Sequence, residues 1–393
     1  DRVAALVEHS GMRRGLCVVV GGDADLALEL THGSEFLVHV RHADQGATAA
    51  LRARADEAGF PIQRLTSDYG SLDNLPHTEN TVDLVIIPEA ADKLSALSAA
   101  DIARALRPEG TAIVGSASKN LDAQKLKQWA NAARVEGVET HDDDTGTWVQ
   151  FRKPPMEGAG EWSHWEHGPD NNPVANDTVI KAPYMTQYLA TPYYIPMPSV
   201  TTVAAGRTFL ALGHITHHRR EWDMIYKLIA RNGYNGIVLW ERDLPEGYLV
   251  HRSAFIATKD TFHMIDGSGA LLLDAQTGAE KGRLQVPGIY GEWKWMAMKD
   301  GVLYVLAGKK GPGTKATLGD RSFGGWSWGD MSRGYYGKPR IPFGFGTMVA
   351  AFDLNTKKTL WTHKEKTTID SRAMAIVDDK LFLFCPEHHV RAL

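Results

Sequence analysis

The sequence predicts two different folds in series: an α/β domain built on a mostly parallel sheet, then an all-β domain of the propeller type. In residues 1–152, short apolar runs alternate with helix-like segments, which is the pattern of a parallel sheet covered on both faces. After residue 200, a strand–turn–strand motif recurs instead. Composition changes as well, because ten of the eleven tryptophans lie after residue 140. A chain of 393 residues is long enough for two domains.

The elements of the first domain, residues 1–152, follow one another in order. We expect strands at residues 16–20, 36–40, 82–87 and 111–115, and helices at 23–30, 47–58 and 99–106. An acidic turn at 142–144 followed by the apolar run 148–151 predicts a closing antiparallel hairpin. Cys17 lies within the first strand between apolar residues, where a buried and unreactive thiol is expected.

Three short motifs in this domain occur at a characteristic spacing. They are Leu75-Pro76, Val82-Asp83-Leu84-Val85 and Leu106-Arg107-Pro108-Glu109-Gly110. Over about residues 10–152 this pattern resembles the class I S-adenosylmethionine-dependent methyltransferases. The resemblance implies a Rossmann-like sheet whose cofactor would lie on the loop Gly21, Gly22 and Asp23. It also implies that Ser67-Asp68 takes the family's third-strand position, where Asp68 would contact the adenine.

The cofactor positions depart from that family's pattern. The loop reads Gly21-Gly22-Asp23-Ala24-Asp25, so the later glycines are replaced. The family ends its second strand with an acidic residue that accepts hydrogen bonds from the ribose, whereas this chain has Arg41-His42 there. Three interpretations stay open: an active methyltransferase, a fold retained for structure or docking, and a domain that binds another nucleotide. We favour the retained fold.

Residues 153–200 join the two domains. Pro154-Pro155 and a glycine-rich stretch form a flexible link, and the aromatic run 162–173 is expected to pack on the propeller as its leading strand. His164, His167 and Asp170 could bind a metal, but no second spaced pair completes a site, so polar packing under a loop is favoured.

Residues 201–393 carry the repeats, at residues 231–240, 273–282 and 352–361. Each copy gives a strand, a turn that begins with Asp or Asn, and a second strand. Asp274 and Asp353 are expected to cap their turns and Gly278 to supply a positive φ. Trp240 and Trp361 end two of the copies and are expected to cover the gap to a neighbouring blade. Positions 232 and 274 are 42 residues apart, the length of a four-stranded blade. The runs 251–257 and 372–377 are expected to be strands of the second and fourth blades, so the sequence predicts three blades and part of a fourth.

This repeat resembles the pyrroloquinoline-quinone (PQQ)-type propeller repeat, found in quinoprotein alcohol dehydrogenases and in non-enzymatic relatives such as the outer-membrane assembly factor BamB. The domain order resembles large secreted proteins of planctomycete-type bacteria, which implies a periplasmic or extracellular location. A working quinoprotein needs Ca²⁺ held by carboxylate and amide oxygens, a catalytic Asp and stacked aromatic rings. Family members often add adjacent cysteines, whereas the two cysteines here, Cys17 and Cys385, lie far apart. We therefore expect neither PQQ nor a metal. The paired histidines at 217–218 and 388–389 are not expected to share a metal ion either, because adjacent side chains point in opposite directions.

A glycine-rich insertion at residues 311–346 interrupts the blade period. Its rings include Trp326, Trp328, Tyr335 and Tyr336, which suit sugar stacking or a protein surface. Such a loop could equally fold back over the propeller.

Bulk properties narrow the function further. A net charge of −4 gives no basic field for nucleic acid, and no apolar run approaches the length of a membrane span. The chain begins at Asp1 without a leader and ends where the next Asp turn is expected, so we expect the native polypeptide, or a partner in a multi-subunit assembly, to supply further blades. The leading interpretation is a non-catalytic or weakly catalytic scaffold or binding protein whose propeller recognises protein or glycan partners. The alternatives are a methyltransferase and a PQQ-dependent dehydrogenase.

Overall fold

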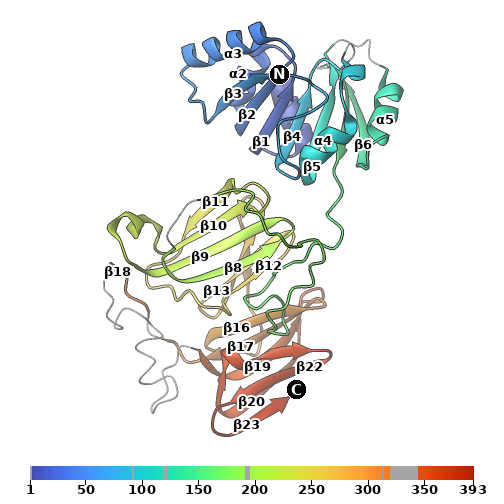
Figure 1. The fold of residues 1–393 in the computed structure, drawn as a ribbon. Helices are drawn as coiled ribbons and strands as arrows, with labels where there is room; N and C mark the ends of the chain where they lie inside the picture. The colour runs from blue at the N-terminus through green and yellow to red at the C-terminus, as the bar shows by residue number, and fades with distance from the viewer. Residues whose placement is uncertain are drawn as a thin grey trace. The chain divides into compact units, whose positions relative to one another are not determined.

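A computed structural model describes residues 2–90, 93–117, 122–144, 146–190, 195–311, 313–318 and 344–393. The chain divides into two compact units, Asp1–Glu157 and Gly158–Leu393. Figure 1 shows a layered α/β unit followed by a unit of small sheets. Among the described residues, none of the helices combines the length and apolarity that crossing a bilayer requires.

The first unit is built on one seven-stranded sheet in the order β3-β2-β1-β4-β5-β7-β6. Its first five strands pair in parallel, and β7 runs antiparallel to both β5 and β6. Their bounds are β1 (Arg14–Val20), β2 (Glu35–His42), β3 (Leu65–Tyr69), β4 (Val82–Ile87), β5 (Leu106–Ser116), β6 (Glu136–Asp143) and β7 (Gly146–Arg152). The sequence therefore predicted this fold class and its closing hairpin correctly, and the unit is Rossmann-like and of the methyltransferase type.

Helices cover both faces of this sheet (Figure 1). They are α1 (Arg2–Ser10), α2 (Ala24–Gly33), α3 (Gln45–Glu57), α4 (Ala99–Ala105) and α5 (Ala123–Asn131), with a short 3₁₀ turn at Leu94–Ala96. Every residue of β4 is buried, so side chains of both orientations enter apolar clusters. Leu84 and Ile86 join the cluster under α1, α2 and α3, while Val85 and Ile87 join the one that contains α4 and α5 residues.

An ion pair inside the sheet joins two of the motifs seen in the sequence. Asp83 of β4 is 1% exposed and accepts hydrogen bonds from the backbone N–H of Leu16 at 2.8 Å and from Arg107 Nε at 2.5 Å. The same carboxylate lies against Gly15, where an added Cβ would come within 2.7 Å of it. A buried charge needs such partners, so Asp83 and Arg107 hold β1, β4 and β5 in place.

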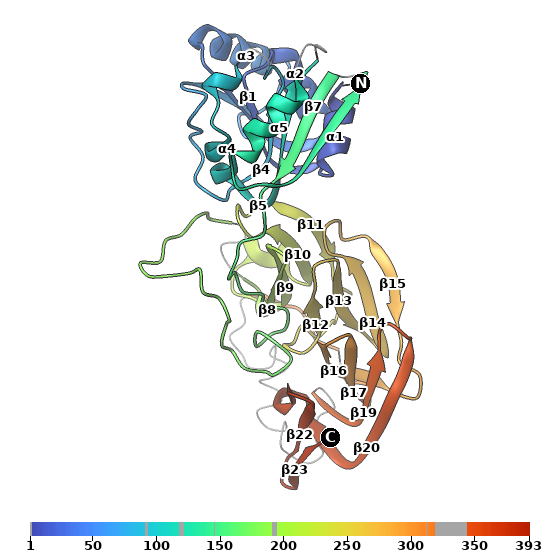
Figure 2. The ribbon, with the colours of Figure 1, turned by 90° about the vertical axis from the view of Figure 1, so that its right-hand side faces the viewer.

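The described residues of the second unit form four small, mainly antiparallel sheets in a propeller-like arrangement (Figure 2). The first contains β8 (Met197–Ala204), β9 (Arg207–Thr216), β10 (Lys227–Asn232), β11 (Val238–Asp243) and the short β18 (Thr317–Leu318). The second contains β12 (Phe255–Ala257), β13 (Thr261–Asp266), β14 (Gly269–Asp274) and β15 (Glu280–Leu284). The third contains β16 (Glu292–Lys299), β17 (Val302–Gly308), β19 (Phe345–Asp353) and β20 (Lys358–Asp370). The fourth is three-stranded, with β21 (Ala375–Val377), β22 (Lys380–Cys385) and β23 (His389–Ala392). Three blades and part of a fourth were predicted, as found.

Residues 162–171, from the aromatic run before the propeller, reach the first strand of every one of these sheets. Trp162 exchanges two backbone hydrogen bonds with Val203 of β8, and the carbonyl of Ser163 accepts one from Ala257 of β12. His164 Nε2 accepts the N–H of Met298 in β16 at 3.1 Å, and the carbonyl of Pro169 accepts that of Ile376 in β21 at 2.9 Å. The segment is therefore a spine that contacts all four sheets, whereas the sequence suggested only a leading strand.

The turn of the second sheet carries the repeat residues in close contact with the first sheet. Asp274 accepts hydrogen bonds from the N–H groups of Gln276 and Thr277 at 3.0 and 2.8 Å, and Gly278 has a φ of +73°. Trp240, on β11, is 7% exposed and donates its indole N–H to Ala275 of that turn at 3.2 Å. An added Cβ on Gly278 would lie 2.6 Å from the Trp240 ring, so the absence of a side chain lets the two sheets meet.

The third sheet repeats the turn with a substitution. Asp353 accepts the N–H groups of Asn355 and Thr356 at 2.8 and 3.0 Å. Lys357 stands where the second copy has Gly278 and adopts a φ of +58°, a region that costs a side-chain-bearing residue about 1–2 kcal/mol. Trp361 is half-buried and its ring lies 6.2 Å from that of Tyr304.

Several predicted boundaries were wrong. A strand was expected at 372–377, but residues Ser371–Ala373 form a 3₁₀ turn because Asp370 caps it by accepting the N–H of Arg372. The strand expected from residue 251 begins only at Phe255. Trp326, Trp328, Tyr335 and Tyr336 lie outside the described residues.

Replacing Gly278 with Ala should destabilise the second unit by more than replacing Gly267. Both glycines have positive φ, +73° and +64°, but only Gly278 faces Trp240, whereas nothing lies within 4 Å of a Cβ at Gly267. Displacing the ring should add about 1–3 kcal/mol to the backbone strain that the two changes share. Urea unfolding followed by tryptophan fluorescence measures the difference, and equal losses for the two variants would contradict the contact.

Acid should weaken the spine through His164. Its Nε2 accepts an N–H, so it must be unprotonated, and burial lowers the pKa of this histidine from 6.5 to about 4. Because the folded pKa is depressed, the stabilisation is complete above about pH 6.5 and is lost as the pH falls toward 4, by at most roughly 3 kcal/mol. His164→Gln keeps an acceptor without a titrating group and should flatten this pH dependence. His388→Gln, at an exposed histidine, is the control, and parallel pH profiles for all three proteins would refute the assignment.

Candidate functional site

The carboxyl ends of β1, β2 and β3 form the edge where parallel α/β sheets bind ligands. This edge contains all four residues that the resemblance implied for cofactor binding, which are Gly21, Gly22, Asp23 and Asp68. The loop after β1 and the end of β2 are joined directly, because the N–H of Gly21 donates to the carbonyl of Arg41 at 2.8 Å. Candidate residues far apart in the sequence are thus neighbours here.

The two glycines of the loop lie against side chains of this chain, Lys93 at Gly21 and Pro88 at Gly22. Gly21 and Gly22 have φ values of +70° and +97°. A Cβ on Gly21 would lie 3.0 Å from Lys93 Nζ, and one on Gly22 would lie 2.8 Å from Pro88. Asp23 is the N-cap of α2 and accepts the N–H of Leu26 at 2.7 Å, the role expected of a capping carboxylate. Lys93 also pairs with Glu89 at 2.7 Å.

Arg41, at the end of β2, covers the next part of the edge. Its guanidinium forms an ion pair with Asp68 and donates hydrogen bonds to the carbonyls of Tyr69 at 3.0 Å and Ser71 at 3.2 Å. It rests on Gly70, where an added Cβ would lie 2.1 Å from the guanidinium. Arg41, which departs from the methyltransferase pattern, therefore pairs with Asp68, the carboxylate that the resemblance places at the adenine.

His39 contacts the other carboxylate oxygen of Asp68, and His77 in turn contacts His39. His39 Nε2 lies 3.1 Å from Asp68 Oδ1, and His39 Nδ1 lies 3.1 Å from His77 Nε2. Burial lowers the pKa of both histidines, that of His77 to about 4. Sequence reasoning missed His39, although the alternation of β2 puts it on the same face as Arg41; nothing in the sequence singled out His77 or Lys93.

His42 completes this edge and is 5% exposed. Burial, followed by the charge of Lys93, lowers the pKa of its imidazole. Arg41 and Lys93 thus supply positive charge, while Asp68 and Glu89 are already paired with them. The resemblance implies an acceptor for two ribose hydroxyls at this place, and the structure has the guanidinium of Arg41 there, paired with Asp68.

The second unit contains a separate pocket of about 340 Å³. That volume suits a small ligand. Its walls come from the segment before β12, from the β13–β14 turn, from the start of β16 and from residues after β17. They include Glu246, Tyr248, His251, Asp266, Trp293 and Lys310.

Charged and aromatic groups line this pocket together. Lys294 is 3% exposed and pairs with Glu292, which also accepts the N–H of Gly311 at 2.8 Å. Burial lowers the pKa of the Lys294 ammonium. The hydroxyl of Tyr248 donates to the carbonyl of Ile265 at 2.8 Å, and the buried indole N–H of Trp293 has no hydrogen-bond partner. Such a lining suits a polar, hydroxyl-rich ligand.

The remaining sequence candidates are placed as follows. His164 is held by the spine contact, and His167 packs edge-on against Trp162 with ring centroids 5.4 Å apart. Among the described residues, His164, His167 and Asp170 do not form a group close enough to share a metal ion. Cys17 is fully buried, as expected, and burial raises the pKa of its thiol.

No protein-family profile matches the chain, and no curated protein matches it. Solved structures similar to it include a provisionally assigned S-adenosyl-L-methionine-dependent methyltransferase of Methanococcus maripaludis (16% identity, 39% of this chain and 84% of that one, TM-score 0.34). Another is a SAM-dependent methyltransferase of Aquifex aeolicus (11% identity, 38% and 88%, TM-score 0.34). A third is the [4+2]-cyclase SpnF (15% identity, 39% and 81%, TM-score 0.35). The strand order described above, and not these scores, identifies the fold.

Proposed function

We propose that this chain is a non-catalytic or weakly catalytic binding protein. Its propeller recognises a glycan or protein partner, and its α/β unit keeps a methyltransferase-type fold without using the cofactor. By the resemblance of the repeats, the propeller belongs to the PQQ-type, BamB-like group, as in secreted proteins of planctomycete-type bacteria. That resemblance also suggests a periplasmic or extracellular location.

The observation that carries the proposal is the ion pair between Arg41 and Asp68. A cation stands where the ribose hydroxyls would need an acceptor, and the adenine-side carboxylate is already engaged. Leaving a buried polar contact unpaired costs about 1–3 kcal/mol, so cofactor binding would require Arg41 to move and lose its partners. Lys93 at Gly21 supports the same conclusion.

The pocket of about 340 Å³ supports recognition by the propeller. Its mixture of carboxylates, lysines and aromatic rings matches the groups that bind sugar hydroxyls and ring faces. We therefore favour a glycan as the ligand of this pocket. A protein partner remains the alternative for the insertion at 311–346.

A methyltransferase is the second candidate function, and the strand order β3-β2-β1-β4-β5-β7-β6 favours it. A PQQ-dependent dehydrogenase has only the repeat motif in its favour.

The unmodified chain should bind S-adenosylmethionine no more tightly than about 100 µM, since each lost polar contact weakens binding roughly five- to a hundredfold. Arg41→Ala frees Asp68 and should bind more tightly than the unmodified chain. Isothermal titration calorimetry measures both. Arg54→Ala is the control, because Arg54 pairs with Asp25 on the helix surface. Low-micromolar binding by the unmodified chain, abolished in Asp68→Ala, would contradict the proposal and favour the methyltransferase candidate.

Lys310→Ala should weaken glycan binding by about two- to tenfold, the effect of losing one hydrogen bond. Thermal-shift screening with neutral and acidic mono- and disaccharides finds the ligand, and calorimetry then compares the variants. Lys309→Ala is the matched control, because Lys309 is the adjacent exposed lysine and is not among the pocket-lining residues. Equal effects of the two changes would argue against the pocket, and failure of every saccharide to bind would argue against the glycan.

A further inference from the structure

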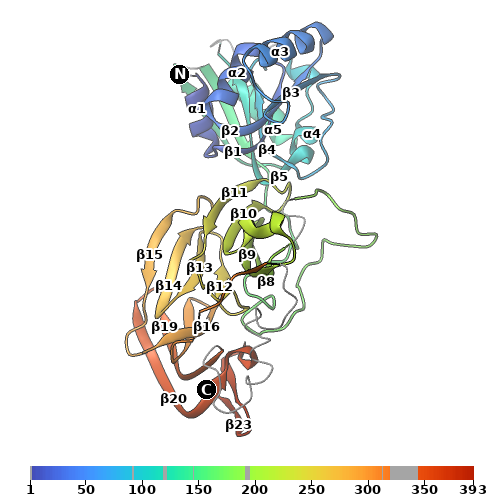
Figure 3. The ribbon, with the colours of Figure 1, turned by 90° about the vertical axis from the view of Figure 1, so that its left-hand side faces the viewer.

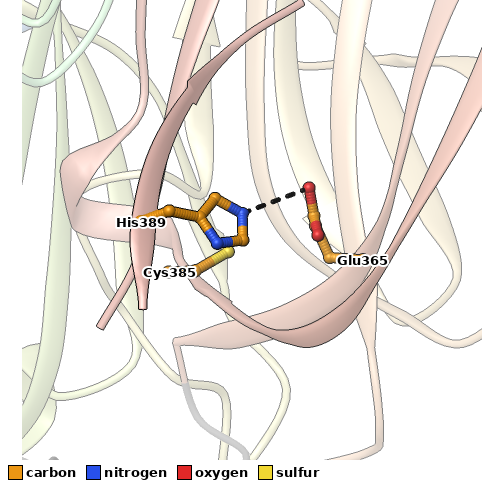
Figure 4. Close-up of side chains that lie close together, drawn as sticks. All are labelled: Glu365, Cys385 and His389. Atoms are coloured by element: carbon orange, nitrogen blue, oxygen red, sulfur yellow. Dashed lines mark ion pairs between the residues drawn. The ribbon is translucent and has the colours of Figure 1, made fainter. Parts of the chain in front are cut away.

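Three side chains with metal-binding atoms gather between the third and fourth sheets of the second unit. Glu365 comes from β20, Cys385 from the end of β22 and His389 from the start of β23. One oxygen, one sulfur and one nitrogen atom of these residues all lie within 4.8 Å of one another. Figure 4 shows the imidazole of His389 directed toward Glu365, with the sulfur of Cys385 beside the ring.

Strand geometry brings these residues together. Cys385 and His389 are directly opposite each other in the β22–β23 ladder, and opposite residues of an antiparallel pair share a face of the sheet. On β20, inward and outward positions alternate, so His363 and Glu365 also share a face. The adjacent pair His388-His389 did not indicate a metal site in the sequence, and the cross-strand partner of the second histidine was missed. Its signal was the Cys-x-x-x-His spacing of a short hairpin.

The hydrogen bonding of the cluster is incomplete. The Nε2 atom of His389 is buried and lies 3.6 Å from Glu365 Oε1, without forming a hydrogen bond. A buried polar atom without a partner calls for an explanation, and an ion is one of the usual ones. Glu365 is 7% exposed. Although burial raises its pKa, His363 and Arg391 bring that pKa below the ordinary value, so the carboxylate is charged.

Glu365 is also held by neighbouring side chains. His363 Nε2 lies 2.8 Å and Arg391 Nε 2.7 Å from Glu365 Oε1. Both contacts reach the same oxygen, so a metal bound through Oε2 would leave them as outer contacts that orient the carboxylate. His363 can alternatively turn to supply a fourth ligand.

The ligand chemistry selects the metal. A thiolate, an imidazole and a carboxylate together suit Zn²⁺, whereas Ca²⁺ and Mg²⁺ prefer sites made of oxygen alone. Zinc binds these ligands at about 2.0–2.3 Å, so shifts of about an ångström would close the cluster around it. Burial raises the pKa of the Cys385 thiol, and on binding its proton is released to solvent.

We propose that Glu365, Cys385 and His389, with His363 or water as the fourth ligand, form a Zn²⁺ site that joins β20 of the third sheet to the β22–β23 hairpin of the fourth. The site is independent of the function proposed for the pocket and for the α/β unit. Its role is structural, because it fastens the three-stranded sheet to its neighbour.

The test uses the full chain, free of tags and stripped with a chelator. Zinc titrated against a chromophoric chelator should bind with one ion per chain and submicromolar affinity, and should raise the unfolding temperature of the second unit. Cobalt should bind with a thiolate-to-metal charge-transfer band. Calorimetry in buffers of different ionisation enthalpy should detect about one proton released per zinc bound.

His389→Gln should weaken zinc binding by roughly a hundredfold or more, since loss of even an outer contact costs about 10–100-fold. Cys385→Ser should remove the charge-transfer band. Cys385 is fully buried, so its replacement could prevent folding. The variant of the half-exposed His389 then provides the test. His388→Gln, at the adjacent exposed residue, is the matched control. Absence of submicromolar zinc binding, a cobalt complex without a thiolate band, or equal affinities for His388→Gln and His389→Gln would each overturn the proposal.

Discussion

The propeller-like unit depends on the spine at residues 162–171. Its hydrogen bonds with Val203, Ala257, Met298 and Ile376 connect one short segment to the first strand of each sheet. Small sheets of this kind have one apolar face and little area, so they need neighbours to become stable. Figure 3 shows the sheets following one another from β8 to β23. Contacts such as Trp240 on Gly278 then fix the spacing between adjacent sheets. The spine aligns the sheets, and the contacts between side chains determine how closely they pack.

Two buried or half-buried ion pairs have different roles in the α/β unit. Arg107 and Asp83 lie inside the sheet, where the pair supports the strand order. Arg41 and Asp68 lie at the carboxyl edge of the sheet, where Arg41 pairs with the carboxylate. A buried pair is costly to break because one charge is left without its partner. The first pair therefore supports the strand order, while the second engages a carboxylate at the carboxyl edge of the sheet.

Periodicity was enough to predict both fold classes. The apolar run 82–87 indicates a buried strand, and the repeated Asp residues indicate tight turns. Both are local properties of the segments concerned. The candidate sites depended on contacts that local patterns do not contain. Nothing around Lys93 indicates that it lies on Gly21, and nothing near Glu365 indicates Cys385, because strand pairing and sheet packing bring those residues together. Arg41 was an informative exception, since its mismatch with a known pattern was visible in the sequence. The strand expected at 372–377 begins only at Ala375, because the cap by Asp370 favours a 3₁₀ turn at Ser371–Ala373.

The spine also has a consequence for the time course of assembly. It precedes all four sheets in the chain, yet its contact from Pro169 to Ile376 closes a loop of roughly 200 residues. Contacts between residues so distant in sequence slow a folding reaction. During synthesis the segment is made before any strand of the four sheets that it contacts. Its contact with the first sheet can form once Val203 has been made, whereas its contact with the fourth must wait for Ile376.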